Sequence, residues 1–517
     1  MSRAAMTITQ PHADRERPYG LGLPLGCALA LMLCTFSMPG REAPTSFGGL
    51  DTIALTKLLI RNVGLVLLTA RVIHAWDGPR RPVIVSTLMP FGLFVAWSIA
   101  SCVWTALPAV SLGQSLGLLT LTLLAANLAL SWRNDDDTSF ILFALSIGLL
   151  ILSSVTAASH VLAPDTMGLN RGELVTEGHT GLVHPSTAGT TAALGIVIVV
   201  GALLLWGWSW TWPLLMGCVI HASVVVFAAS RTPASVAAII LLLMTCVYLS
   251  RQWLGLILVI VSAIGTLYIA MDPNLIGAEH VFSAVTGHYQ RGESAEQLSS
   301  FSGRTDLWEI IWRDFFYSPV LGHGYFVTTQ NGSTDVWGEP SNLTAHNLPL
   351  QILASTGLIG AGLFLYGIGL WFFVLGRRLM ERNDTQHLKL LIVFGLWNLG
   401  GGTFGEGFMG GLYPEAVATF VALGIGIGAA LNPDEERDLH RLPTLHFRRA
   451  RGEEYVIGSS PNAGSRHTSS ICRNAPHRLA SCDGSRRSSA SRRSSIANRN
   501  ASSSSACVKR STHRTTG

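Results

Sequence analysis

Three side chains in this sequence have both the chemistry and the position to act on a substrate: Arg231, Arg304 and His346. A guanidinium group is always charged and matches phosphate oxygens in a bidentate geometry, so either arginine is suited to bind a phosphate group. His346 lies directly before a long apolar run that begins at Leu348, and is therefore at or next to the N-terminus of a predicted helix. The positive end of that helix dipole, with Asn347 as its cap, favours the neutral imidazole that a general base needs and also attracts phosphate.

Each of these residues also has a structural interpretation. Arg231 precedes Thr232 and Pro233, a pair that suits the cap and first turn of a helix, so it could anchor a helix end at a membrane interface. Arg304 could be a surface residue in the first turn of a helix, although a helix N-terminus is unfavourable for a cation. A lone histidine near a membrane interface is usually a structural hydrogen-bonding residue. On the residues alone, both interpretations stay open.

Four further residues are weaker candidates. Lys57 and Arg61 lie four residues apart on one face of a predicted membrane span, where charges are costly unless they are paired or face a polar cavity. They could help to bind a phosphate group, or their charged ends could extend to the membrane surface. His323, in a Gly-His-Gly-Tyr turn, is more typical of a loop or interface residue. Glu406 is a candidate carboxylate in a glycine-rich turn, a composition that more often indicates close helix packing or a mobile turn.

The stretch from Phe301 to Gly362 must position Arg304 and His346. Its first part has apolar residues at helical spacing and predicts an amphipathic helix that lies on a membrane surface or on the ends of other helices. The apolar face consists of Leu307, Trp308, Ile310, Ile311, Trp312, Phe315 and Phe316. Pro319, Gly322 and Gly324 then predict turns, and a polar loop leads to His346.

Composition excludes a water-soluble protein of this length. The chain has 517 residues, of which 49% are hydrophobic and only 13% charged, and its mean hydropathy is +0.39. These values predict an all-α polytopic membrane protein. Apolar runs of spanning length predict about twelve transmembrane helices, at 21–38, 51–73, 83–104, 109–131, 138–160, 186–206, 211–229, 233–250, 253–271, 348–375, 388–404 and 411–431.

The distribution of Lys and Arg predicts the orientation of these spans. With residues 1–20 as a cytoplasmic segment, basic residues recur in the inside loops, as the positive-inside rule requires. Spans one to nine then occupy 21–271, a large outer loop 272–347, and spans ten to twelve 348–431. The segment from Asp272 to Ala345 contains nine acidic residues and three arginines, so the outer loop is acidic. The net charge of +5 hides this asymmetry and gives no indication of nucleic-acid binding.

The remaining parts of the sequence carry little chemistry. Residues 432–517 form a basic tail rich in Ser and Arg, which we expect to be disordered because it has too little apolar surface to fold. The first apolar run has no convincing cleavage site after it and is predicted to be a retained helix. The eight cysteines lie in the spans or in the tail, a distribution that indicates neither a disulfide framework nor a cysteine zinc site.

Three motifs, in this order and spacing, carry a resemblance to a known family. They are SGRTDLW at 302–308, SPVLGHGY at 318–325 and AHNLPLQILASTGLIG at 345–360. Together they resemble the O-antigen ligase and polymerase superfamily, multi-spanning bacterial membrane enzymes that move glycans from a polyprenyl diphosphate carrier. The motif region covers about an eighth of the chain.

The resemblance implies a glycosyltransferase of cell-surface polysaccharide biosynthesis, in the bacterial inner membrane with its site on the periplasmic face. It implies that His346 is catalytic, that Arg231 and Arg304 bind the carrier diphosphate, and that no cofactor, nucleotide sugar or metal is needed. The implied partners are an undecaprenyl-diphosphate-linked glycan, a saccharide or lipid-linked acceptor and the bilayer. Ligation to lipopolysaccharide core, polymerisation and transfer to protein hydroxyls remain open, and so does a transporter of polysaccharide or carrier lipid.

The predicted topology is directly testable with reporter fusions. A reporter joined at Gly332 should indicate the periplasm and one joined at Ser460 the cytoplasm, because an odd number of predicted helix crossings separates the two positions. Paired alkaline phosphatase and fluorescent protein fusions measure this. If both positions fall on one side, the predicted number of spans is wrong.

Overall fold

The computed structural model of the chain divides it into two units, residues 1–445 and 446–517. Every residue that the structure describes belongs to the first unit, so the predicted disorder of the tail lies outside the described residues. The described residues are 20–36, 41–42, 52–75, 81–169, 179–206, 211–248, 304–332, 335–336, 339–340, 345–381, 389, 391–392, 395–397 and 413–430, with the single residues 262, 283 and 287.

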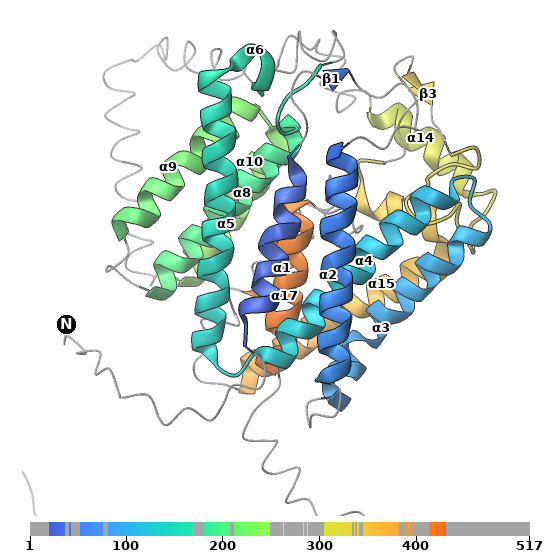
Figure 1. Cartoon of the computed structure of the whole chain (residues 1–517), viewed down its shortest axis with the longest axis horizontal. Coiled ribbons are helices and arrows are strands. Elements are labelled where there is room, and N and C mark those ends of the chain that lie inside the picture. Colours follow the sequence, from blue (N-terminus) through green and yellow to red (C-terminus); the bar gives the residue numbers. More distant parts are fainter. Residues whose placement is uncertain are drawn as a thin grey trace, which may run out of the picture. The chain divides into compact units, whose positions relative to one another are not determined.

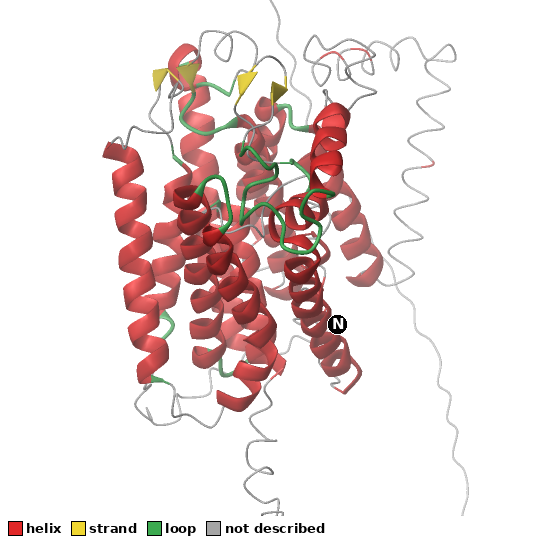
Figure 2. Ribbon diagram, turned by 90° about the vertical axis from the view of Figure 1, so that its right-hand side faces the viewer, coloured by secondary structure: helices red, strands yellow, loops and turns green. Residues whose placement is uncertain are grey.

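This part of the chain is built almost entirely of helices (Figure 2). The long helices are α1 (Gly22–Met32), α2 (Thr52–His74), α3 (Arg81–Ala100), α4 (Pro108–Ser131), α5 (Asp135–Leu162), α8 (Pro185–Trp206), α9 (Thr211–Ala228), α10 (Arg231–Tyr248), α14 (Arg304–Phe315), α15 (Leu348–Glu381) and α17 (Pro414–Ala430). Short elements are α6 (Pro164–Met167) and the 3₁₀ turns η1 (Leu33–Thr35) and η2 (Ser101–Val103). Two small antiparallel pairs join β1 (Arg41–Glu42) to β2 (His179–Thr180) and β3 (Asp335–Val336) to β4 (Glu339–Pro340).

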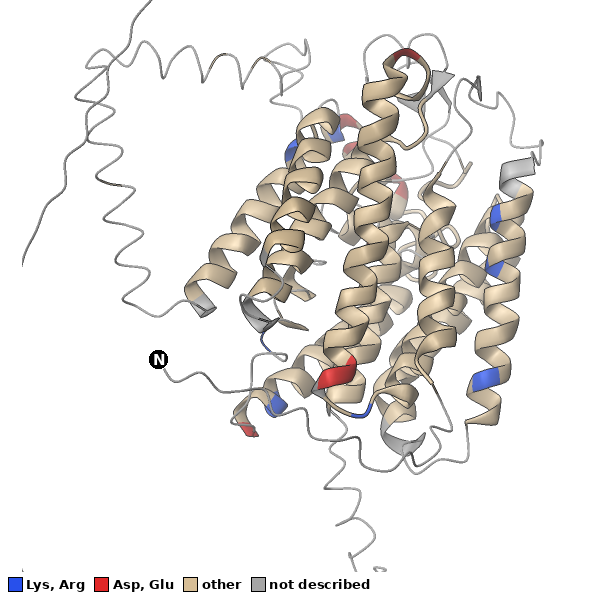
Figure 3. Ribbon diagram, turned by 60° about the vertical axis from the view of Figure 1, so that its left-hand side comes forward, with Lys and Arg blue, Asp and Glu red and all other residues tan. Residues whose placement is uncertain are grey.

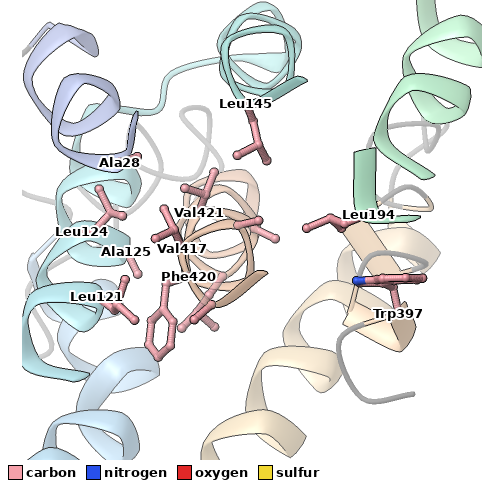
Figure 4. Close-up of a cluster of buried hydrophobic side chains, with 14 of the residues drawn as sticks. Ala28, Leu121, Leu124, Ala125, Leu145, Leu194, Trp397, Val417, Phe420 and Val421 are labelled. Carbon is pink, nitrogen blue, oxygen red and sulfur yellow. The ribbon is translucent and has the colours of Figure 1, made fainter. Parts of the chain in front are cut away.

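Helix α17 lies between two groups of helices. It packs against α4 and α15 on one side and against α5 and α8 on the other, with α1 beside it. The first group contains α2, α3, α4 and α15, and the second contains α5, α8, α9 and α10 (Figure 1). Figure 4 shows Val417, Phe420 and Val421 of α17 among side chains of the neighbouring helices. All three are at most 1% exposed, so α17 is a fully buried central helix.

The structure confirms a polytopic helical membrane protein. Five helices are long and apolar enough to cross a membrane, at 84–103, 108–131, 136–162, 185–203 and 348–381, as found among the described residues. Charged residues occupy few positions on the described helices, and long stretches carry none (Figure 3). Helices coincide with ten of the twelve predicted ranges, while nearly all of 253–271 and much of 388–404 lie outside the described residues.

Short connections fix the directions of the helices. Residues 132–134 join α4 to α5, and residues 229–230 join α9 to α10, so each pair is antiparallel. The end of α5 lies near the start of α8. The His160 imidazole accepts a hydrogen bond from the N–H of Leu169, and a Cβ on Gly181, four residues before α8, would lie 2.5 Å from the carbonyl oxygen of Gly168. A Cβ on Gly189 of α8 would meet Ser230, which immediately precedes α10. We call this end, where α4, α8 and α10 begin, the loop end of the bundle; α6, α14 and the strands lie there (Figure 1).

Helix α15 is broken at Gly357, which has φ 65° and ψ −170°. In an unbroken helix the N–H groups of Leu358 and Ile359 would bond to the carbonyls of Ala354 and Ser355. Instead, the residues before α15 supply all four partners. Leu358 and Ile359 donate to the carbonyls of Pro319 and Val320 at 2.9 and 3.4 Å, and His323 and Gly324 donate their backbone N–H groups to Ala354 and Ser355 at 2.9 and 3.0 Å. The 319–324 loop is therefore hydrogen-bonded into the break.

Two glycines allow this close approach. A Cβ on Gly357 would overlap the carbonyl group of Val320, and a Cβ on Gly322 would lie 2.5 Å from the backbone of Ser355 and Gly357. Gly322 also has a positive φ of 73°. The predicted turn at this point is confirmed, but the break in the following apolar run is a feature that the sequence pattern did not reveal.

Replacing Gly357 by alanine should destabilise the protein strongly, because the backbone conformation is essentially restricted to glycine and the new methyl group would overlap Val320. We expect a loss of roughly 3 kcal/mol, measured as a lower thermal unfolding midpoint in detergent. Gly362→Ala is the matched control in the same helix, since a Cβ there meets nothing within 4 Å. Equal unfolding midpoints for the two variants would contradict the proposed role of the break.

Candidate active site

His346 occupies a strained position between a loop and the start of α15. Its φ is 48°, in the left-handed region that few residues other than glycine adopt. Such a conformation costs about 1–3 kcal/mol and is most often found at functional sites. The side chain is half-buried, and α15 begins two residues later, at Leu348.

Asn347 caps α15, as the sequence predicted. Its side-chain oxygen accepts a hydrogen bond from the N–H of Leu350 at 3.2 Å, and its carbonyl accepts from the N–H of Gln351 at 2.8 Å. The positive end of the helix dipole therefore lies directly beside His346.

Two side chains hold the residue before His346. The N–H of Ala345 donates to the Gln351 side-chain oxygen at 2.5 Å, and the carbonyl of Ala345 accepts from the Trp308 indole N–H at 2.8 Å. Gln351 is fully buried, and its amide nitrogen also donates to the carbonyl of Phe326 at 3.4 Å. We call Trp308, Ala345 and Gln351 the Ala345 clamp.

Helix α14 carries Arg304 and packs on α15, which confirms the predicted amphipathic helix. Leu307 and Ile311 form a small buried cluster with Ala345, Leu350 and Ala354. Trp312 and Phe316, which belong to the predicted apolar face, are 48% and 62% exposed, so only part of that face is covered by the described residues. Arg304 is the first residue of α14, one helical turn before Trp308 of the Ala345 clamp. The structure thus brings the helix of Arg304 and the backbone of His346 together.

His323 fastens the 319–324 loop to the end of α14. Its side chain is buried, and its Nε2 lies 3.1 Å from the carbonyl oxygen of Asp314. Because a carbonyl can only accept, Nε2 carries the hydrogen. The Asp314 carboxylate lies 3.6 Å from the same nitrogen and accepts a hydrogen bond from the N–H of Gln330 at 2.5 Å. This geometry gives His323 a structural part in holding α14 against the loop.

Arg231 lies at the same loop end but on the other group of helices. It is the first residue of α10, and the carbonyl of Ser230 accepts from the N–H of Ala234 at 3.4 Å. The helix therefore begins before Thr232, so Thr232 and Pro233 belong to its first turn, and Thr232 is not the cap that the sequence suggested. Ala229 turns the chain with a φ of 44°. Helix α10 packs against α8, whereas α14 packs against α15.

Arg231 and Arg304 share an unusual electrostatic feature. Each is the first residue of a helix, where the dipole disfavours a cation. His346 precedes a third helix N-terminus. Positive helix ends and guanidinium groups both favour anions, so these positions gain from a negatively charged ligand.

Lys57 and Arg61 are both partly buried on α2. Arg61 donates from Nη1 to the carbonyl of Gly113, near the start of α4, at 2.7 Å. Its Nε is buried and has no hydrogen-bond partner among the described residues. In the described part of the chain no carboxylate forms an ion pair with either side chain. Glu406 lies outside the described residues.

Trp308 and Gln351 were not predicted from the sequence as residues of this site. Trp308 was assigned to the apolar face of a helix, and that assignment gives no indication of where its N–H points. Gln351 carried a usable signal, because a side-chain amide within an apolar run must find partners when it is buried.

Comparison with known proteins agrees with the motifs. No curated protein matches the chain. Residues 216–365 match a family model described as O-Antigen ligase, and this range contains Arg231, Arg304, the Ala345 clamp and the break in α15. The match confirms the resemblance seen in the sequence and supports membership of the chain in the O-antigen ligase superfamily.

Proposed function

We propose that this membrane enzyme transfers a glycan from a polyprenyl diphosphate carrier to an acceptor hydroxyl. The observation that carries the proposal is the strained, half-buried His346 at a helix N-terminus, next to the helix that begins with Arg304. The family match over residues 216–365 supports the same class of reaction.

In this reaction the two arginines stabilise negative charge and the histidine accepts a proton. Arg304 and Arg231 bind the diphosphate and stabilise the negative charge that grows on it as the bond to the anomeric carbon breaks. His346 takes the proton of the acceptor hydroxyl as that oxygen forms the new bond to the same carbon. The diphosphate leaves with the electron pair of the broken bond, and the proton remains on the imidazole until it is released.

Arg231 and Arg304 lie on different groups of helices, and this arrangement suits a large donor. Helix α10 begins with Arg231, and α14, which packs on α15, begins with Arg304, while α17 separates the two groups. A polyprenyl chain lies between spans, its diphosphate at the loop end, and the glycan extends into the aqueous phase.

The length of α15 supports a site at the membrane surface. Its part after the break, 358–381, is about 36 Å long at 1.5 Å per residue. This exceeds the roughly 30 Å hydrocarbon thickness, so the part before the break extends toward the aqueous side. We place the loop end at the periplasmic face of the inner membrane, with twelve spans and residues 272–347 as a periplasmic loop.

The acceptor distinguishes the related reactions. We propose ligation to a lipid-linked saccharide acceptor such as lipopolysaccharide core, since the matching family is described as O-antigen ligase. Polymerisation and transfer to protein use the same donor and differ in which hydroxyl His346 meets. Offering each acceptor class to the purified enzyme distinguishes them, and transport without transfer would yield none of these products.

His346→Ala should abolish transfer while leaving donor binding nearly unchanged, because the imidazole acts on the acceptor proton. Loss of a positioned base lowers the rate by about a hundredfold to ten-thousandfold. The measurement is turnover of polyprenyl-diphosphate glycan by protein in nanodiscs, alongside donor affinity. His74→Ala, an exposed histidine at the end of α2, serves as the control. Near-normal turnover by a folded His346→Ala variant would exclude this mechanism.

Arg304→Ala should weaken donor binding as well as rate, because it removes a charge that contacts the diphosphate. Arg304→Lys should restore function only in part, since an ammonium group cannot reproduce the bidentate contact of a guanidinium. Arg133→Ala is the control, an exposed arginine between α4 and α5. Full activity of Arg304→Lys would show that charge alone is sufficient, and unchanged donor affinity in Arg304→Ala would remove Arg304 from the diphosphate site.

A further inference from the structure

The Ala345 clamp acts on the peptide group that contains the nitrogen of His346. The carbonyl of Ala345 belongs to that peptide group, so the Trp308 indole, donating to this oxygen at 2.8 Å, fixes its plane. The N–H of the preceding peptide is held by the side chain of Gln351 at 2.5 Å. A left-handed φ at His346 persists only when surrounding contacts determine it, and these two bonds lie directly beside it.

We propose that Trp308 and Gln351 are positioning residues for His346. The proposal rests on the function proposed above, in which His346 is the base. Neither side chain needs to touch the substrate. Each holds the backbone from which the imidazole projects, and a shift of about 1 Å in a catalytic group can lower a rate by about a hundredfold.

Trp308 also connects the two halves of the proposed chemistry. Arg304 and Trp308 are separated by one turn of α14, and residues four apart lie on the same side of a helix. Helix α14 therefore begins with Arg304, which binds the diphosphate, and through Trp308 it also holds the peptide group that contains the nitrogen of His346. Gln351 makes the corresponding link within α15, from Ala345 to the carbonyl of Phe326.

Phe326 shows that Gln351 joins two strained segments. The φ of Phe326 is 69°, in the left-handed region. Gln351 therefore bonds to one left-handed residue, Phe326, and to Ala345, which directly precedes the left-handed His346. The buried amide of Gln351 accepts from one backbone N–H and donates to one backbone carbonyl, and these two groups are nineteen residues apart. It therefore fixes the loop and the start of α15 relative to each other.

The test removes the indole N–H while keeping an aromatic ring. Trp308→Phe should lower kcat about tenfold to a hundredfold and leave donor affinity unchanged. Trp312→Phe is the matched control, because it makes the same substitution one turn later on α14, at a tryptophan that is 48% exposed. The control should keep full activity. Thermal unfolding midpoints of both variants should be compared, since a merely structural residue would lower stability and donor affinity together.

A second pair of variants tests Gln351. Gln351→Met removes both hydrogen bonds and should lower kcat as Trp308→Phe does, whereas Gln351→Glu keeps the oxygen that accepts from Ala345 and should retain more activity. If Gln351→Met fails to fold, the Trp308 comparison still decides.

The outcomes separate this inference from the proposed function. An active His346→Ala variant, measured in the same assay, would remove the base and the reason for positioning it. An inactive His346→Ala variant together with wild-type kcat in Trp308→Phe would overturn the positioning role alone. A fall in donor affinity that matches the fall in rate would likewise overturn it, because the effect would then act through Arg304 or through general stability.

Discussion

The break in α15 and the loop that fills it hold the described site together. Four backbone groups that a continuous helix would pair in two internal hydrogen bonds instead form four bonds to residues 319–324. Backbone groups at membrane depth must be satisfied within the protein, so this loop cannot leave without exposing them. The indole of Trp97 completes the arrangement by donating to the carbonyl of Thr356 at 2.9 Å. Through this contact, and through the Ser101 hydroxyl that accepts from the N–H of Tyr325 at 2.8 Å, the loop is also fixed to α3 and η2.

Local sequence patterns predicted the elements of this site but not how they interlock. The periodicity of residues 304–316 predicted α14, and Asn347 before an apolar run predicted the cap of α15. The break was hidden, because a glycine within an apolar run also fits a continuous membrane helix. Its cause lies about 35 residues earlier, in backbone groups of the 319–324 loop that carry no pattern of their own. Long-range backbone pairing of this kind cannot be deduced from residue types.

For the charged candidate residues, too, the sequence predicted the residue but not its hydrogen-bond partner or its position as the first residue of a helix. Residue type was enough to single out Arg61, but its partner is the carbonyl of Gly113, a group that every residue possesses. Arg304 was singled out within its motif and Arg231 as an arginine at a predicted helix end, and the structure adds that both begin helices. Two separate helices thus carry a cation at their first residue, where the helix dipole disfavours positive charge.

The hydrogen bonds at Gly357 also decide against a continuous α15. Closing α15 into one helix would pair Leu358 with Ala354 and Ile359 with Ser355, and would release the loop. Two helical bonds would then replace the four bonds to the loop, so the number of backbone hydrogen bonds favours the broken helix. The length of the closed helix acts in the same direction, because its 34 residues would extend about 51 Å, far more than a bilayer core accommodates without tilt.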